Sequence, residues 1–172
     1  MNAIIENLLT RRSTRAFLQK EIPDNELNEI LQAAIYAPSG MGKQTWKFTV
    51  LCNQEKTQQL AELIGRKLGR KGYDMYRPQV LIIPSNQKEN PHGMEDNACA
   101  LENIFLAAHS FGIGSVWINQ LRTLCDDPEV RALLDEFEIP SDHVVYGMAA
   151  LGYPAAVSYT HLRAHETLRH LV

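Results

Sequence analysis

Residues 94–118 read MEDNACALENIFLAAHSFGIGSVWI, and this stretch decides the fold. Residues 94–111 predict one long helix, because apolar side chains spread over much of its circumference; they include Ala98, Leu101, Ile104, Phe105 and Ala108. A helix that is apolar on most sides is buried, so we expect it at the centre of the molecule. Gly112 is a natural residue to end that helix. Residues 115–118 are then typical of a strand.

Shorter elements are predicted on both sides of this stretch. Helices are expected over residues 3–10, from Asp24 to about residue 37, over residues 55–68, and from Asp127, which precedes Pro128. Strands are expected over residues 47–52, 80–83 and 144–151, the second of them stopped by Pro84. This order fits a doubly wound parallel sheet and a mixed α+β sheet equally well, and periodicity does not decide between them.

The composition limits the classes of partner. The chain has 172 residues, of which 45% are hydrophobic, and a formal net charge of -3, which disfavours a nucleic-acid partner. Its three cysteines are far apart and form no CxxC pair, so neither a disulfide framework nor a metal site is expected. No run of about 18 apolar residues exists, so no membrane span is predicted. We therefore expect a soluble, cytoplasmic protein.

Residues 11–15 concentrate positive charge directly after the first helix. Arg11, Arg12 and Arg15 surround Ser13 in the run RRSTR. Guanidinium groups present forked donors that match phosphate oxygens, and a hydroxyl adds another donor. The run predicts a phosphate site, and a solvated basic turn is the equal alternative from composition alone.

Residues 37–46, APSGMGKQTW, are similar to a phosphate-binding loop at first sight. The Walker A pattern requires glycine where Ala37 stands and a hydroxyl residue where Gln44 stands. It also requires a strand before the loop and a helix after it, whereas here a helix precedes and a strand follows. The segment is therefore not a P-loop.

Four motifs in order carry a family resemblance. They are RRSTRAF (residues 11–17), APSGMGKQTWKF (37–48), the alanine-rich helix that leads into FGIGSVWI (111–118), and GMAALGYP (147–154). Together they resemble the nitroreductase superfamily over residues 3–156. The resemblance implies an α+β fold, with helices flanking a central, mainly antiparallel sheet. It also implies a homodimer that holds two FMN molecules at the subunit interface.

The resemblance assigns three groups of residues to the flavin. The first group grips the FMN phosphate and ribityl chain: Arg11, Arg12, Ser13 and Arg15. The second reaches the flavin from the partner subunit: Pro38, Ser39, Gly40 and Gln44. The third lies beside the isoalloxazine ring: Trp117, Ile118 and Asn119. Trp117 fits a core position equally well, and His109 near the helix end is expected to cap or pack.

The implied activity is hydride transfer from NAD(P)H through FMN to a nitroaromatic, a quinone or a similar organic acceptor. A flavin supplies this chemistry, so the protein has to bind, orient and tune it. No Ser/His/Asp set or carboxylate pair stands out, and we assign no catalytic side chain. The alternatives are another flavin activity on the same fold, such as reductive dehalogenation or ring dehydrogenation, and a flavin-binding protein without turnover.

The resemblance ends before the last residues of the chain. We expect a nitroreductase-like FMN-binding domain over residues 1–156. The remaining tail, VSYTHLRAHETLRHLV (157–172), departs from the family and looks like translated read-through of foreign DNA. We expect it to be disordered and to have no function. Relatives carry a basic arm in its place, so its loss bears on FMN affinity and on dimer packing.

Overall fold

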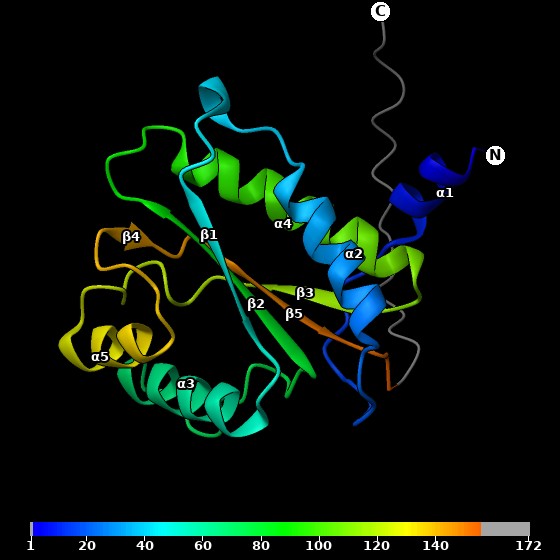
Figure 1. Cartoon of the computed structure of the whole chain (residues 1–172). Helices are drawn as coiled ribbons and strands as arrows, with labels where there is room; N and C mark the ends of the chain where they lie inside the picture. The colour runs from blue at the N-terminus through cyan, green and yellow to red at the C-terminus, as the bar shows by residue number, and fades with distance from the viewer. Residues whose placement is uncertain (1, 156–172) are drawn as a thin grey trace, which may run out of the picture.

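A computed structural model describes residues 2–155 of the chain (Figure 1). In chain order the elements are α1 (Ala3–Thr10), α2 (Asp24–Ile35), the 3-10 turn η1 (Gly40–Gly42), β1 (Trp46–Leu51), α3 (Gln54–Lys67), β2 (Val80–Gln87), α4 (Gly93–Ser110), β3 (Gly114–Ile118), α5 (Pro128–Glu136), β4 (His143–Val144) and β5 (Met148–Gly152). The expected tail, residues 157–172, lies outside the described residues.

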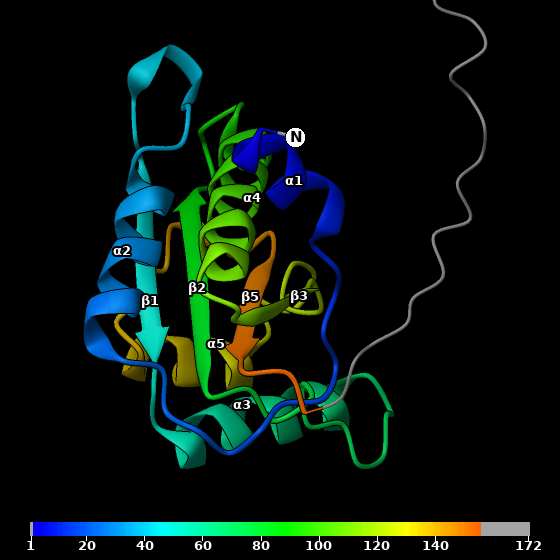
Figure 2. The ribbon, with the colours of Figure 1, turned by 90° about the vertical axis from the view of Figure 1, so that its right-hand side faces the viewer.

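The sheet is antiparallel, with strand order β1-β2-β5-β3 and β4 paired to β2. This confirms the α+β expectation and rules out the doubly wound parallel alternative. Successive side chains of β2 enter different cores: Leu81 and Ile83 pack with α3 and α5, whereas Val80 and Ile82 pack with α2 and α4. Helices therefore cover both faces of the sheet, as Figure 2 shows.

Helix α4 is central, as its sequence predicts. Leu101 and Ile104 are fully buried in it, and Gly112 follows it with the left-handed φ of +72° that suits a residue after a helix end. Asp127 starts α5 as expected, because its side chain accepts hydrogen bonds from the N–H groups of Glu129 and Val130.

The predicted end of the strand at residues 80–83 and the single strand predicted at residues 144–151 are both wrong. The two errors meet where these segments pair. Strand β2 continues through Pro84, which stands opposite Phe48 of β1. The predicted strand 144–151 is instead two strands, because β5 pairs with residues 80–82 of β2 and β4 pairs with Asn86 and Gln87. The register shifts by one residue between these two pairings, so residues 83–85 lie beside a break in the ladder. A strand tolerates proline where the ladder needs no backbone donor.

Helix α1 lies beside α4 at the edge of the molecule and buries none of its residues (Figure 2). Asn7 holds it there by donating a hydrogen bond from Nδ2 to the carbonyl oxygen of Leu106, 2.9 Å away. The helix therefore depends on few contacts within its own chain. No helix in residues 2–155 is long and apolar enough to cross a membrane.

Candidate functional site

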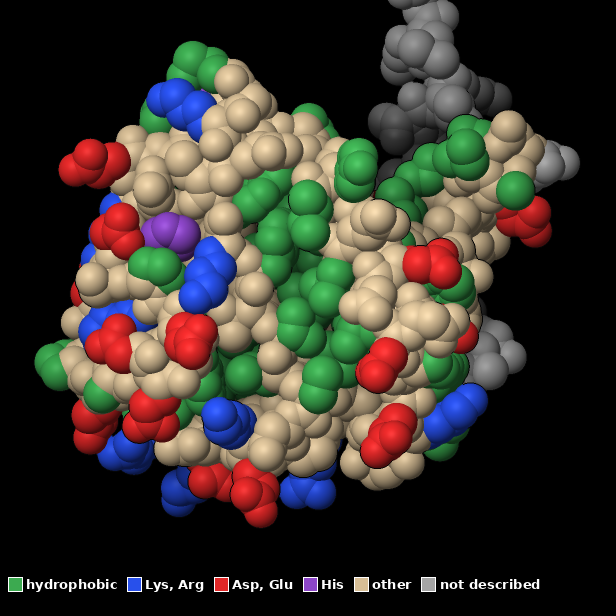
Figure 3. Space-filling view, in the orientation of Figure 1, with side chains coloured by type: hydrophobic (Ala, Val, Ile, Leu, Met, Phe, Trp, Pro, Cys, Tyr) green, Lys and Arg blue, Asp and Glu red, His purple; other side chains and the backbone are tan. Residues whose placement is uncertain are grey.

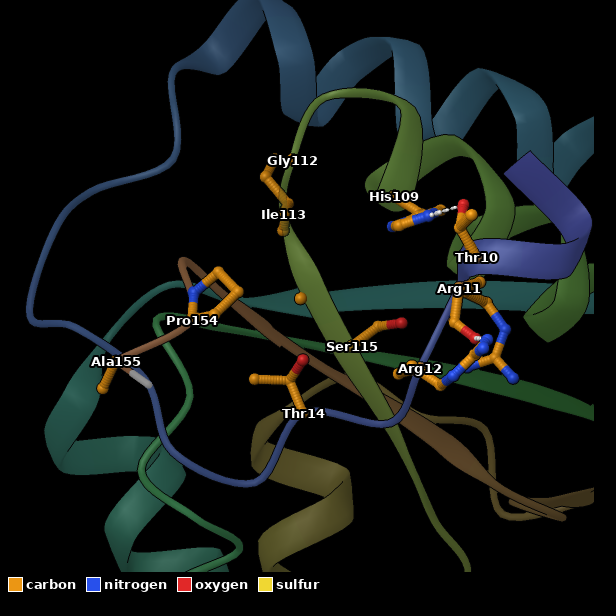
Figure 4. A pocket seen from close by; sticks show the side chains of 11 residues that line it. Thr10, Arg11, Arg12, Thr14, His109, Gly112, Ile113, Ser115, Pro154 and Ala155 are labelled. Atoms are coloured by element: carbon orange, nitrogen blue, oxygen red, sulfur yellow. Dashed lines mark hydrogen bonds between the residues drawn. The ribbon is translucent and has the colours of Figure 1, made fainter. Parts of the chain in front are cut away.

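A cavity of about 450 Å³ opens between the end of α1 and the start of β3 (Figure 4). Its size falls in the range of small-molecule sites. The polar side chains that line it come from three segments; they are Thr10, Arg11, Arg12, Thr14, His109 and Ser115. We call this space the arginine cavity.

The chain after α1 reaches the cavity by running along β3. The Thr14 N–H donates to the Ser115 carbonyl oxygen at 2.8 Å, and Ser13 forms a parallel bridge with Ser115. This approach requires glycine at position 114, because a Cβ there would lie 2.5 Å from Thr14 Oγ1. The pairing thus fixes Arg11 and Arg12 beside the first residues of β3.

Two polar side chains of the cavity have donors that are not used within the described residues. Arg12 Nη1 donates to the carbonyl oxygens of Leu9 and Arg11, both at 2.7 Å, and no other hydrogen bond of this guanidinium is found in residues 2–155. The Ser115 hydroxyl is buried and has no hydrogen-bond partner within the described part of the chain. A buried hydroxyl without a partner is costly, so these groups are suited to an anionic ligand with several acceptor oxygens.

His109 packs against α1 and also faces the cavity. The Thr10 hydroxyl donates to the Glu6 carbonyl oxygen at 2.7 Å and therefore accepts from His109 Nε2, 2.9 Å away. Desolvation lowers the pKa of His109, and the nearby Arg11 and Arg12 lower it further. The packing role expected from the sequence is confirmed, but its place in the cavity lining was not predicted.

The loop at residues 38–44 is tied to the start of α4. Ser39 Oγ donates to Asp96 Oδ2 at 3.3 Å and accepts the Gln44 N–H at 2.9 Å, while the Gly40 N–H donates to Asp96 Oδ1 at 2.7 Å. Pro38 and Gln44 are exposed. Figures 1 and 2 show this loop well away from α1, so one chain does not bring it to the arginine cavity.

The third predicted group lies at the other end of β3. Ile118 is buried in the core, so its side chain faces away from any ligand on the surface. Trp117 is 41% exposed, and its ring centroid lies 6.2 Å from that of Phe105. Asn119 is exposed, with its backbone N–H bonded to Gln120 Oε1. Strand β3 spans about 10 Å from Ser115 to Ile118 and links this end to the arginine cavity.

The lining of the arginine cavity overlaps only in part with the first group of predicted residues. Ser13 and Arg15 do not line the cavity, whereas Thr14 and Ser115 do. No sequence signal marks Thr14 or Ser115, because their roles depend on the pairing of two distant segments. Asp96 was also missed, although a signal exists: it shares a helix face with Ala100 and Ile104, which are fully buried.

Residues 8–153 match the nitroreductase family. This chain is a member of the nitroreductase family. A protein of Archaeoglobus fulgidus, named for an inferred NADH dehydrogenase/NAD(P)H nitroreductase activity, is 31% identical over 90% of this chain and 87% of its own length. The FMN reductase (NADPH) of Bacillus subtilis is 27% identical, and the similarity covers 92% of this chain and 68% of the length of that protein.

A solved structure agrees with this membership. The nitroreductase of Bacteroides fragilis, crystallised with bound FMN, has a TM-score of 0.86 to this chain and 46% sequence identity. The similarity covers 90% of each chain. The mainly antiparallel sheet flanked by helices is therefore the fold of the nitroreductase family.

Proposed function

We propose that this chain is an FMN-dependent NAD(P)H oxidoreductase that reduces a nitroaromatic, a quinone or a similar organic acceptor. Membership of the nitroreductase family supports the reaction class. The names of the Bacillus subtilis and Bacteroides fragilis proteins support NADPH as reductant and FMN as cofactor. When bound, FMN would supply the hydride chemistry that links the nicotinamide to the acceptor, and the chain would bind and orient it.

The observation that carries the proposal is that Arg12 and Ser115 of the arginine cavity have donors that no group in residues 2–155 uses. Arg12 and the buried Ser115 hydroxyl offer donors that suit a phosphate group, and Arg11 adds a second positive charge. The cavity therefore fits the phosphate end of FMN. No side chain is assigned a catalytic role, because the task of the chain is to bind and orient the flavin and its substrates.

The proposed assembly is a homodimer. Helix α1 exposes its apolar residues Ile4, Ile5, Leu8 and Leu9, and the end of α2 exposes Tyr36. Figure 3 shows hydrophobic side chains along α1 and over the α2 side of the molecule. An eight-residue helix without a buried side chain is unstable alone, and exposed apolar patches mark interaction surfaces. A second copy would cover α1 and would bring its loop 38–44 to the arginine cavity.

A cytoplasmic location belongs to the same proposal. All three cysteines are free in the described residues, which fits a reducing compartment. The partners are then a second copy of the chain, NAD(P)H and a small organic acceptor, without nucleic acid or a membrane.

Spectroscopy of the purified protein tests this function. We expect a flavin spectrum whose visible band disappears when NADH or NADPH is added anaerobically and returns when a nitroaromatic or a quinone follows. Chromatography of the heat-released cofactor should identify FMN. Release of FAD would contradict the cofactor assignment. A bound flavin that neither nicotinamide reduces would favour a flavin-binding protein without turnover.

A further inference from the structure

Asp96 joins the loop at residues 38–44 to α4. It is 2% exposed, and its carboxylate accepts hydrogen bonds from Gly40 N–H at 2.7 Å, Asn90 Nδ2 at 3.1 Å and Ser39 Oγ at 3.3 Å. Gly40 and Ser39 lie more than fifty residues away in the sequence. The carboxylate therefore holds a distant loop, whereas a capping residue would bond to the first N–H groups of its own helix.

The hydrogen bonds to Asp96 determine which neighbouring side chains act as donors and which as acceptors. An ionised carboxylate only accepts hydrogen bonds, so the amide of Asn90 must present its NH2 group to Asp96. The same NH2 group donates to Thr45 Oγ1 at 2.8 Å, and Thr45 in turn donates to Asn86 Oδ1 at 2.6 Å. Asp96 thus holds the loop directly at Ser39 and Gly40, and through Asn90 it holds Thr45, the residue that follows the loop.

The loop adopts a backbone that its own sequence does not favour. Met41 and Gln44 have left-handed φ values of +55° and +48°, which residues with a side chain rarely adopt. Gly40 packs so closely on His92 that a Cβ would lie 2.6 Å from that ring. Such conformations persist where the surroundings hold them, and here Asp96 supplies the fixed point.

The loop uses some of its polar groups in internal hydrogen bonds and leaves others exposed. The Ser39 hydroxyl is used within the loop, between Asp96 and the Gln44 N–H. The Gln44 side chain is exposed and makes no hydrogen bond to residues 2–155. Gln44 is therefore, with Met41 and Lys43, one of the exposed side chains that this loop can offer to a neighbouring molecule.

We propose that Asp96 is a positioning residue for the flavin pocket of the partner subunit. This inference rests on the proposed function, from which it takes the homodimer and the FMN at the interface. Asp96 holds loop 38–44 in the one shape that presents Gln44 to the partner's arginine cavity. Its effect on FMN is exerted in trans, across the dimer interface, and not on the arginine cavity of its own chain.

The variant Asp96→Asn tests the positioning role directly. It places an NH2 group opposite the Asn90 NH2, so two donors face each other. The hydrogen bond from Asn90 to residue 96 is then lost. Glu95→Gln is the matched control, because Glu95 lies in the same turn, is exposed and makes no hydrogen bond within the described residues. Trypsin should cleave after the exposed Lys43 about tenfold faster in apo Asp96→Asn than in the wild type or Glu95→Gln.

FMN titration by fluorescence then measures the effect on the pocket. We expect Asp96→Asn to weaken FMN binding about tenfold or more, and Glu95→Gln to bind as the wild type does. If Asp96→Asn does not fold, Ser39→Ala keeps the carboxylate and removes one of its partners. It should show the same faster cleavage after Lys43 to a smaller degree, and unchanged cleavage in both variants would overturn the inference.

Mixed dimers decide whether Asp96 acts across the interface. Mixing apo Asp96→Asn with apo Arg12→Ala chains produces heterodimers with one site that combines an intact arginine cavity and an intact loop. About a quarter of all sites in a random mixture should regain wild-type FMN affinity. Mixtures that gain no tight sites would overturn the inference and leave Asp96 as a residue that acts within its own chain. A wild-type protein that binds no FMN would instead overturn the proposed function itself.

Discussion

The arginine cavity and loop 38–44 differ in how many of their polar groups have hydrogen-bond partners within residues 2–155. In the cavity, Ser115 has a buried hydroxyl without a partner, and Arg12 has unused donors among the described residues. In the loop, Ser39 and Gly40 are already bonded to a buried carboxylate. The first region keeps its polar groups free for a ligand, whereas the second uses them to hold a shape. A binding site shared by two subunits can thus combine one part that supplies charge with another that supplies geometry.

Removing the charge should have the largest effect. Arg12→Ala is expected to weaken FMN binding about 10- to 100-fold, because a charge-assisted contact to phosphate contributes about 1.5–3 kcal/mol. Arg15→Ala is the control that sharpens the comparison, since Arg15 is exposed and does not line the cavity. Fluorescence titration measures both affinities. Equal losses in the two variants would return residues 11–15 to the status of a general basic patch.

Removing the buried hydroxyl should affect FMN binding but should not reduce the stability of the apo protein. Ser115→Ala removes a group that has no partner in residues 2–155, so the apo protein should be as stable as the wild type or more so. FMN binding should weaken about fivefold, the effect of one hydrogen bond of about 1 kcal/mol. Thermal unfolding with and without FMN measures both effects. Lower apo stability with unchanged FMN affinity would mean that the hydroxyl serves the fold and not the ligand.

The pH dependence of stability should report the burial of His109 and, to a smaller extent, the nearby Arg11 and Arg12. Its pKa is below the ordinary 6.5, so the folded state resists a proton that the unfolded state accepts. Stability of the apo protein should therefore fall as the pH drops through about 6.5. His143, whose pKa burial also lowers, contributes with the same sign. His109→Gln should reduce this slope in urea unfolding and not abolish it, and an unchanged slope would contradict the assignment.

The smallest effect is expected from the end of the chain. The family match stops at residue 153, so residues 157–172 lie outside it. Deleting residues 157–172 should leave the circular dichroism spectrum and the FMN affinity unchanged. Loss of the dimer on truncation would show that the tail is structural.

The sequence predicted the helices well, because their apolar periodicity and capping residues are local properties. The end of the sheet was harder to predict. The run at residues 144–151 is compatible with one strand except at Gly147, and this isolated glycine is a signal of the break opposite Pro84 but does not give the register shift. Similarly, the arginines were found from composition, but the partners of the cavity, Thr14 and Ser115, meet only through pairing of distant segments.

The family resemblance placed loop 38–44 in the flavin site but did not show what holds it. Asp96 is hard to predict because its place on the buried face of α4 is its one sequence signal, and that signal does not reveal the distant loop that it binds. The strand that contains Ile118 was predicted correctly, and the alternation of its side chains explains why Ile118 is buried while Trp117 is exposed.

Sedimentation of the apo and FMN-loaded protein over a dilution series tests the central claim, that two chains share each flavin. A ligand that binds only the assembled state shifts the equilibrium toward that state. The FMN-loaded protein should therefore remain dimeric at dilutions at which the apo protein dissociates. A monomer that carries tightly bound FMN at every concentration would contradict the shared site and separate loop 38–44 from the arginine cavity.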